Sequence, residues 1–150
     1  MTENKKEQYK IILEYIKDLS IETPSASTLL FVRENINSYQ MDIDISSLVL
    51  KNKSLEITTK LILQDKKNST EKAFFEIQYA TVISIDTSIT DKKVISRIVL
   101  SDLQKFIYPK IEKIFLDLIK NAGYPNIKFE KNVDFEKMYK NKENSIQWYS

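Results

Sequence analysis

The chain has 150 residues, of which 42% are hydrophobic, so it is long enough to form one domain with a sizeable core. Its 23 basic and 21 acidic residues leave a net charge of +2, which argues against a chain built mainly to bind nucleic acid. Cysteine and histidine are absent, and a single glycine is present. This composition excludes disulfides, histidine catalysis, the usual zinc sites and glycine-rich phosphate loops. We therefore expect a protein that is not an enzyme and needs no metal or cofactor.

The N-terminal sequence MTENKKEQYK is polar and lacks the apolar core of a signal peptide, so we expect a soluble, cytoplasmic protein. Segment Tyr9–Ile21 is ambiguous, because its apolar residues fit either a helix or a strand and intrinsic propensity weakly favours a helix. Pro24 interrupts this segment. After it, Ser27–Val32 can form a short helical turn that begins at Ser25 or Ser27.

Three segments then alternate between apolar and polar residues, which is the pattern of a strand with one buried and one wet face. They are Ser38–Ser46, Ser54–Gln64 and Lys72–Ile85. The third segment is apolar on both faces in its second half, which predicts a central strand. Asp42 and Asp44 share one face of the first strand and could contact a cation, but a solvated strand face is the better interpretation.

The segment Leu103–Ala122 repeats apolar residues at steps of three and four, which predicts a long helix. Its apolar arc is roughly 140° wide, so we expect burial against more than one surface, such as a sheet and a partner helix. Ser101 and Asp102 are N-cap residue types directly before it, and Gly123 stands where a left-handed C-cap would fall. The preceding Val94–Leu100 fits either a last strand or a preliminary helix.

A short amphipathic helix is predicted at Val133–Tyr139, where apolar residues recur on one side. Consecutive strands followed by helices predict an α+β fold, with helices on one face of an antiparallel sheet. We expect a single domain over residues 1–140 and a polar C-terminal tail over residues 141–150.

Four segments, in unbroken order, resemble the SecB family of protein-export chaperones. They are Tyr15–Ala26 (YIKDLSIETPSA), Phe75–Ile85 (FEIQYATVISI), Phe106–Phe129 with Pro109 and Pro125, and Val133–Tyr139 (VDFEKMY). The resemblance covers about Ile11–Tyr139 and implies a four-stranded antiparallel sheet with a long helix and short helices packed on one face. It makes Ile11–Ile21 a strand, against the weak propensity for a helix.

The resemblance also implies a function. Members of this family are holdases that work without ATP, assemble as homotetramers (dimers of dimers) and keep preproteins unfolded in apolar grooves for the Sec translocase. By match to the family, the client groove is implied at Tyr39, Met41, Ile43, Phe129, Phe135, Met138 and Tyr139. Docking of the motor SecA is implied at Asp18, Glu22, Phe74 and Glu76. Because the family packs its long helix between subunits, the implied oligomer residues are Ile107, Ile111, Ile114, Phe115 and Leu118.

The chain departs from the family pattern in three ways. It has Ala80-Thr81 where the family has two glycines, a slightly basic net charge where the family is acidic, and a C-terminal tail, KNKENSIQWYS, that is not acidic. These departures bear mainly on motor docking. Two other functions therefore stay open, namely a SecB-like chaperone specialised to one partner such as an antitoxin, and an interaction domain that binds no clients.

Overall fold

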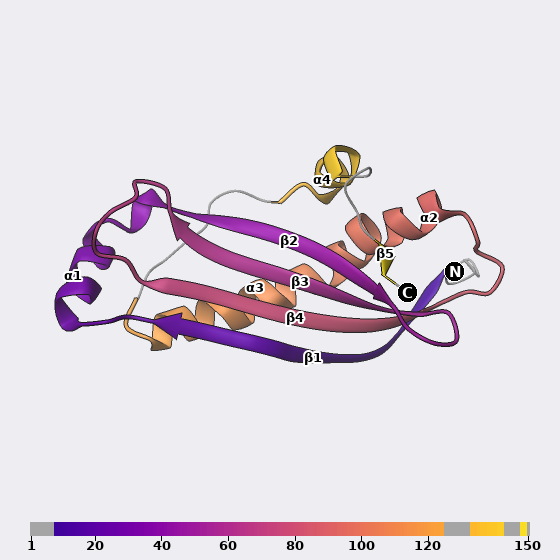
Figure 1. The fold of residues 1–150 in the computed structure, drawn as a ribbon, viewed down its shortest axis with the longest axis horizontal. Coiled ribbons are helices and arrows are strands. Elements are labelled where there is room, and N and C mark those ends of the chain that lie inside the picture. The colour runs from indigo at the N-terminus through magenta and orange to yellow at the C-terminus, as the bar shows by residue number, and fades with distance from the viewer. Residues whose placement is uncertain (1–7, 125–132, 143–147, 150) are drawn as a thin grey trace, which may run out of the picture.

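The computed structural model describes residues 8–124, 133–142 and 148–149, and it has one sheet and several helices (Figure 1). Two of the helical segments are short, the 3₁₀ turn η1 and the π-helical turn η2. In chain order the elements are β1 (Tyr9–Glu22), α1 (Ala26–Glu34), η1 (Ile36–Ser38), β2 (Tyr39–Val49), β3 (Ser54–Asp65), β4 (Phe74–Ile85), α2 (Lys92–Arg97), η2 (Ile98–Asp102), α3 (Leu103–Asn121), α4 (Phe135–Lys142) and β5 (Trp148–Tyr149).

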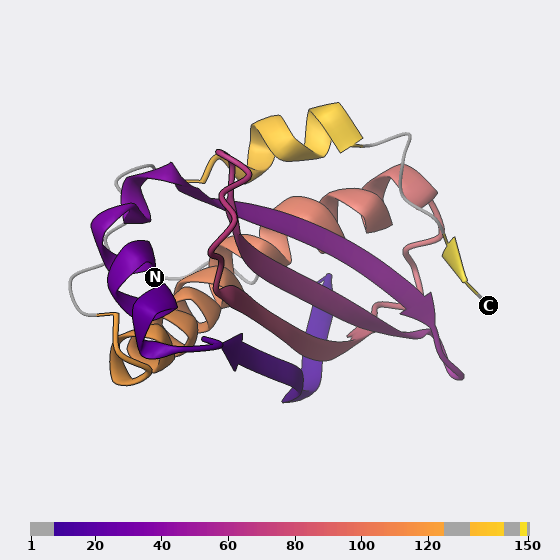
Figure 2. The same cartoon turned by 60° about the vertical axis from the view of Figure 1, so that its left-hand side comes forward.

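The sheet has the strand order β1-β4-β3-β2-β5. Its first four strands pair antiparallel, and β5 pairs parallel with β2. As predicted from its two apolar faces, β4 lies inside the sheet, between β1 and β3. The helices α2 and α3 cover one face of this sheet, as Figure 2 shows. The predicted α+β fold with a four-stranded antiparallel sheet is confirmed, with β5 as a two-residue addition.

The ambiguous segment after residue 8 is a strand, as the family resemblance implied and against the helix propensity. The pairing of β1 with β4 shifts register twice, between Ile11 and Leu13 and between Ile16 and Asp18. Each shift inserts one extra residue into β1, as in a β-bulge. Because each insertion changes which residues face the helices, the apolar residues of β1 follow no single period, and this is why its sequence was ambiguous.

The long helix begins earlier than the sequence predicted. Segments α2, η2 and α3 follow one another without a break from Lys92 to Asn121, so Val94–Leu100 is helical. Asp91 is the N-cap of this stretch, and its carboxylate accepts a hydrogen bond from the Lys93 amide at 2.9 Å. The expectation that Ser101 or Asp102 caps the helix is wrong, because the backbone before them is already helical.

Two other helix ends agree with the sequence. Gly123 follows α3 with φ of +111°, a left-handed conformation that residues with a Cβ avoid. At α1, the Ser25 hydroxyl accepts a hydrogen bond from the Thr28 amide at 3.1 Å, so Ser25 is the cap. These ends fix where the chain leaves each helix and turns toward the next element.

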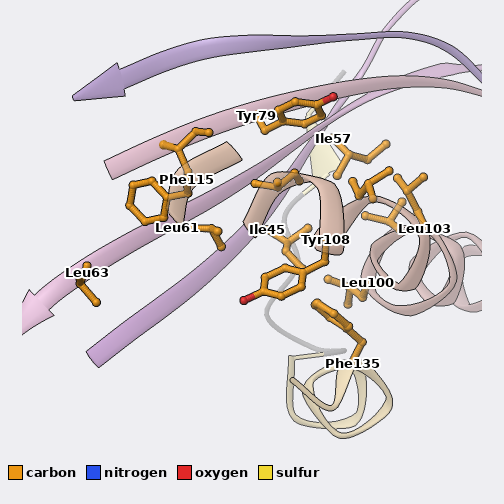
Figure 3. Packing of buried hydrophobic residues seen from close by; sticks show 14 of the residues in the cluster. Ile45, Ile57, Leu61, Leu63, Tyr79, Leu100, Leu103, Tyr108, Phe115 and Phe135 are labelled. Carbon is orange, nitrogen blue, oxygen red and sulfur yellow. The ribbon is translucent and has the colours of Figure 1, made fainter. Parts of the chain in front are cut away.

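The core lies between the sheet and the long helix, where Figure 3 shows side chains from the inner sheet face meeting those of α3. Ile57, Leu61 and Ile77 of the sheet are fully buried, as are Ile107 and Phe115 of α3. Burying apolar area yields roughly 25 cal/mol per Å², so this layer is the main source of stability.

A polar group interrupts this core. Gln104 on α3 is fully buried, and its Nε2 donates a hydrogen bond to the Thr59 hydroxyl on β3 at 2.9 Å. Thr81 on β4 is also fully buried, but within the described residues its hydroxyl has no hydrogen-bond partner. The two threonines are therefore matched in burial and differ in hydrogen bonding.

This difference predicts opposite effects of one substitution. Thr81→Val removes a buried hydroxyl that lacks a partner, so we expect it to stabilise the fold by about 1 kcal/mol. Thr59→Val leaves the buried amide of Gln104 unpaired, so we expect a loss of roughly 1–3 kcal/mol. Urea unfolding of both variants measures the two changes, and shifts of the same sign would contradict this account.

Candidate functional site

The residues implied as a client groove come from two elements, β2 and α4. Met41 and Ile43 of β2 and Met138 of α4 are half-buried, and they pack against the edge of the main core. Tyr39, Phe135 and Tyr139 are buried within that core, with 7%, 5% and 9% of their surface exposed. Phe129 lies outside the described residues. The accessible part of the implied groove is therefore formed by the half-buried side chains of Met41, Ile43 and Met138.

Helix α4 is attached to the long helix by aromatic contacts. Figure 3 shows the ring of Phe135 beside that of Tyr108. The two rings meet edge to face, with centroids 5.1 Å apart. The Arg97 guanidinium lies 5.8 Å from the centroid of the Tyr139 ring, within the range of a cation–π contact. These contacts hold α4 on the long helix through Phe135 and Tyr139, and Met138 of the same helix packs partly buried against the core.

An ionic cluster adds to this attachment. The Glu136 carboxylate accepts hydrogen bonds from Arg97 Nη2 at 2.9 and 3.1 Å, from Lys105 Nζ at 3.0 Å and from the Ser101 hydroxyl at 3.3 Å. The Lys105 hydrogen bond and the positive charges of Lys105 and Arg97 hold the pKa of Glu136 below its ordinary value. One side chain of α4 thus pairs with two cations of the long helix, on α2 and α3.

The residues implied in motor docking lie together on the sheet face opposite the helices. Asp18 and Glu22 of β1 pair with Gln78 and Phe74 of β4, and Glu76 lies between these two positions. Glu22 and Phe74 also line a hollow of about 320 Å³. Phe74 is 42% exposed. The structure therefore brings all four residues to one surface, where Glu22 lies opposite the exposed Phe74 and Asp18 and Glu76 follow further along the strands.

The helix residues implied in oligomer contacts divide into two groups. Ile107, Ile111 and Phe115 are fully buried within the chain itself, against the sheet. Ile114 and Leu118 are half-buried and border the outer surface. The centre of the wide apolar arc of α3 thus packs on the sheet, and the margin of this arc remains accessible.

Apart from Phe74, the most exposed apolar residues were not assigned a role from the sequence. Phe106 of α3 is 64% exposed. Four large apolar residues of the edge strand β1 are also more than 40% exposed, namely Ile12, Leu13, Tyr15 and Ile16. The signal that could have identified them is the run of apolar residues in β1, which fits no one-sided strand.

Polar contacts link this exposed strand to the helix. The Tyr79 hydroxyl donates a hydrogen bond to Glu14 Oε1 at 2.9 Å, and Lys110 Nζ donates to the same oxygen at 2.8 Å. Burial, together with the Glu14 carboxylate, raises the pKa of Tyr79 to about 12. Glu14 therefore joins β1, β4 and α3 directly beside the exposed apolar residues.

Two further features of the described residues bear on metal binding and membrane insertion. In the described ranges, no group of three or more acidic, cysteine or histidine side chains could hold a metal ion. Asp42 instead forms a surface ion pair with Lys66, at 2.9 Å. No helix within these same ranges is long and apolar enough to cross a membrane.

These features define a class of protein, an α+β domain that covers one face of its sheet with a long helix and leaves apolar and acidic surfaces accessible. The chain belongs to the SecB family, since the family model described as "Preprotein translocase subunit SecB" matches residues 2–145. Proteins of this family are chaperones that catalyse no reaction, so family membership confirms the expectation that the chain is not an enzyme.

Individual relatives agree with this assignment. A protein of Pelagibacter ubique named "Putative protein-export protein SecB" is 45% identical over 144 residues, which cover 96% of this chain and all of the relative. The protein-export protein SecB of Rhodopseudomonas palustris strain HaA2 is 23% identical over 133 residues, covering 89% of this chain and 82% of the relative.

A solved structure has the same fold. It is a SecB-like chaperone of Mycobacterium tuberculosis in complex with a peptide from an antitoxin, and it matches with a TM-score of 0.62 and 11% identity. The match covers 84% of this chain and 88% of that one. At this identity the likeness confirms the fold alone.

The ionic cluster around Glu136 predicts a weaker attachment of α4 when its charge is removed. We expect Glu136→Gln to raise amide hydrogen exchange across residues 135–142, because Arg97 and Lys105 then lose their shared anion. Asp117→Asn is the matched control, since Asp117 pairs with Lys113 elsewhere on α3. If exchange in α4 rose equally in the control, the cluster would have no specific role.

The same measurement has a pH dependence of known sign. Because the folded-state pKa of Glu136 is lowered, its contribution is present above the ordinary value of 4.5 and is lost as the pH falls through the folded-state value. We therefore expect the exchange difference between wild type and Glu136→Gln to shrink below about pH 4.5. A difference that stays constant into acid would contradict the assignment to this carboxylate.

Proposed function

We propose that this protein is an ATP-independent holdase that binds unfolded preproteins through apolar surface and keeps them competent for export through the Sec translocase. The observation that carries the proposal is membership of the SecB family over nearly the whole chain. The structure supports it with exposed or half-buried apolar side chains on β1, β2, α3 and α4. Since preproteins are synthesised in the cytoplasm, we place the activity there.

The chemistry of the accessible groove residues suits a broad range of clients. Met41 and Met138 have flexible, polarisable side chains that can adapt to differently shaped partners. Ile43 adds apolar area beside Met41 on β2. Burial of apolar client area at roughly 25 cal/mol per Å² gives affinity without requiring a particular sequence.

We further propose that the protein assembles as a homotetramer, a dimer of dimers. Exposed apolar residues occur on the β1 edge strand and at Phe106, and an isolated chain would leave this surface in water. The half-buried Ile114 and Leu118 at the margin of α3 extend the same argument along the helix. Contact between subunits on β1 and α3 would cover these side chains and leave β2 and α4 for clients.

Docking of a SecA-type motor is proposed for the opposite sheet face. Asp18, Glu22 and Glu76 bring three carboxylates to this region, beside Lys60 and Lys72, and Phe74 adds an exposed aromatic ring. Acidic side chains around an apolar contact suit a partner with a basic, partly apolar surface.

A chaperone for a single partner is the second candidate function. The SecB-like structure from Mycobacterium tuberculosis was solved with an antitoxin peptide, which favours this alternative over an interaction domain without clients. Affinity capture from cells separates the two candidates. Many different preproteins on the captured chaperone would support the export function, and one dominant partner would support the specialised function.

Client binding predicts that denatured citrate synthase, diluted into buffer, aggregates less when the protein is present. We expect Met41→Gln combined with Met138→Gln to weaken this suppression about tenfold, because each substitution removes part of an apolar contact area. Leu30→Gln is the control, since Leu30 is 58% exposed but lies on α1, outside the implied groove. Wild-type protein that fails to suppress aggregation would refute the holdase proposal.

Assembly predicts a mass in solution near four times the chain mass of 17.6 kDa. We expect Phe106→Asp to reduce this mass, because it places a charge on the most exposed apolar residue of α3. Leu30→Asp is the control on α1. Light scattering measures both, and a wild-type monomer, or a Phe106→Asp variant that remains a tetramer, would contradict the proposed interface.

A further inference from the structure

The C-terminal strand β5 is unlike the other strands of the sheet. It has two residues, Trp148 and Tyr149, which pair with Ser47 and Leu48 of β2, about one hundred residues earlier in the chain. This pairing is parallel, whereas the four longer strands pair antiparallel. The sheet of β1 to β4 is continuous without β5, so the small strand is added to a structure that is already complete.

The position of β5 is that of a peptide bound to a sheet edge. An edge strand presents backbone N–H and C=O groups that can pair with any extended segment, and many proteins bind peptides in this way. At this place the inner side of β2 carries a serine instead of an apolar residue. The Ser47 hydroxyl is buried and has no hydrogen-bond partner within the described residues. Leu48, on the other side of the strand, is 39% exposed.

The composition of the tail resembles that of an unfolded client segment. Residues 144–150 (NSIQWYS) carry no charge, although 29% of the whole chain is charged, and they include its single tryptophan. An extended, uncharged, aromatic segment is the kind of sequence that an export chaperone would bind. The chain thus supplies such a segment to its own sheet edge.

The β5 contact also lies in line with the implied groove. Met41 and Ile43 precede Ser47 on the same strand, and β5 follows α4 in the chain. Because β5 runs parallel to β2, a client that ran in this direction past Met41 and Ile43 would next reach Ser47 and Leu48. There it would meet the position that Trp148 and Tyr149 occupy.

We propose that the β2 edge at Ser47–Leu48 binds extended, uncharged polypeptide, and that the C-terminal strand is an intramolecular competitor that clients displace. A two-residue strand makes few backbone hydrogen bonds, so a longer segment can replace it. This inference rests on the proposed holdase function and adds a means of regulating access to the same groove.

The test uses the full-length chain and a dye-labelled peptide with the sequence of residues 143–150, ENSIQWYS. In a variant with Trp148→Pro and Tyr149→Pro, both positions lose the backbone N–H that donates hydrogen bonds in strand pairing. Without its tethered competitor this variant should bind the peptide at least about fivefold more tightly than wild type does, as measured by fluorescence anisotropy. The same peptide N-methylated at Trp and Tyr should bind weakly.

A second measurement tests whether the β2 edge is covered. Amide hydrogen exchange across residues 46–50 should be faster in the double-proline variant than in wild type, and the added peptide should restore the protection. Reduced, carboxymethylated α-lactalbumin, a permanently unfolded polypeptide, should compete with the labelled peptide for the variant.

Three outcomes would overturn the inference. The first is equal peptide affinity for wild type and variant, and the second is undiminished binding of the N-methylated peptide. The third is wild-type protection at residues 46–50 that disappears on dilution, which would assign the contact to a neighbouring copy. An aggregation assay separates failure of this inference from failure of the proposed holdase function. If wild type and the double-proline variant both suppress aggregation but bind the peptide equally, only this inference fails. Conversely, the peptide binding can be measured even if neither protein suppresses aggregation.

Discussion

Burial of one face of the sheet against the helix of residues 92–121 is the interaction on which the other features depend. It places the centre of the apolar arc of α3, including Ile107, Ile111 and Phe115, inside the chain. It also provides the surface on which α4 packs, through Tyr108 and the cations of the same helix. Since a single long helix can cover only part of a four-stranded sheet, the other face and the β1 edge remain accessible.

This division of surfaces explains how a domain without reactive groups can have several partners. The helix side holds the core and carries α4 and the inner residues of β2. The opposite face carries Phe74 and three carboxylates, and the exposed Leu13 and Tyr15 of the β1 edge lie on the same face. Apolar area, charge and an open strand edge are thus available for the partners that we propose, namely other subunits, clients and a motor.

Much of the fold could be predicted from the sequence, because β2, β3 and β4 alternate cleanly and α3 has a strong helical period. The nature of β1 could not, because two register shifts remove its periodicity and only the family resemblance indicated a strand. The start of the long helix was also misplaced, since Ser101 is a cap residue by type but is buried inside the helix. The implied docking residues share one face because strand pairing aligns Asp18 and Glu22 with β4.

The site was harder to predict than the fold, and the reason is physical. An apolar residue in a strand or helix has the same sequence signature whether it faces the core, a client or another subunit. Met41 and Tyr39 lie on the same side of β2, yet Met41 is half-buried and Tyr39 is buried, because the neighbouring elements cover them to different extents. In the holdase function that we propose, client binding therefore depends on which side chains the fold leaves uncovered, and local sequence does not encode this property.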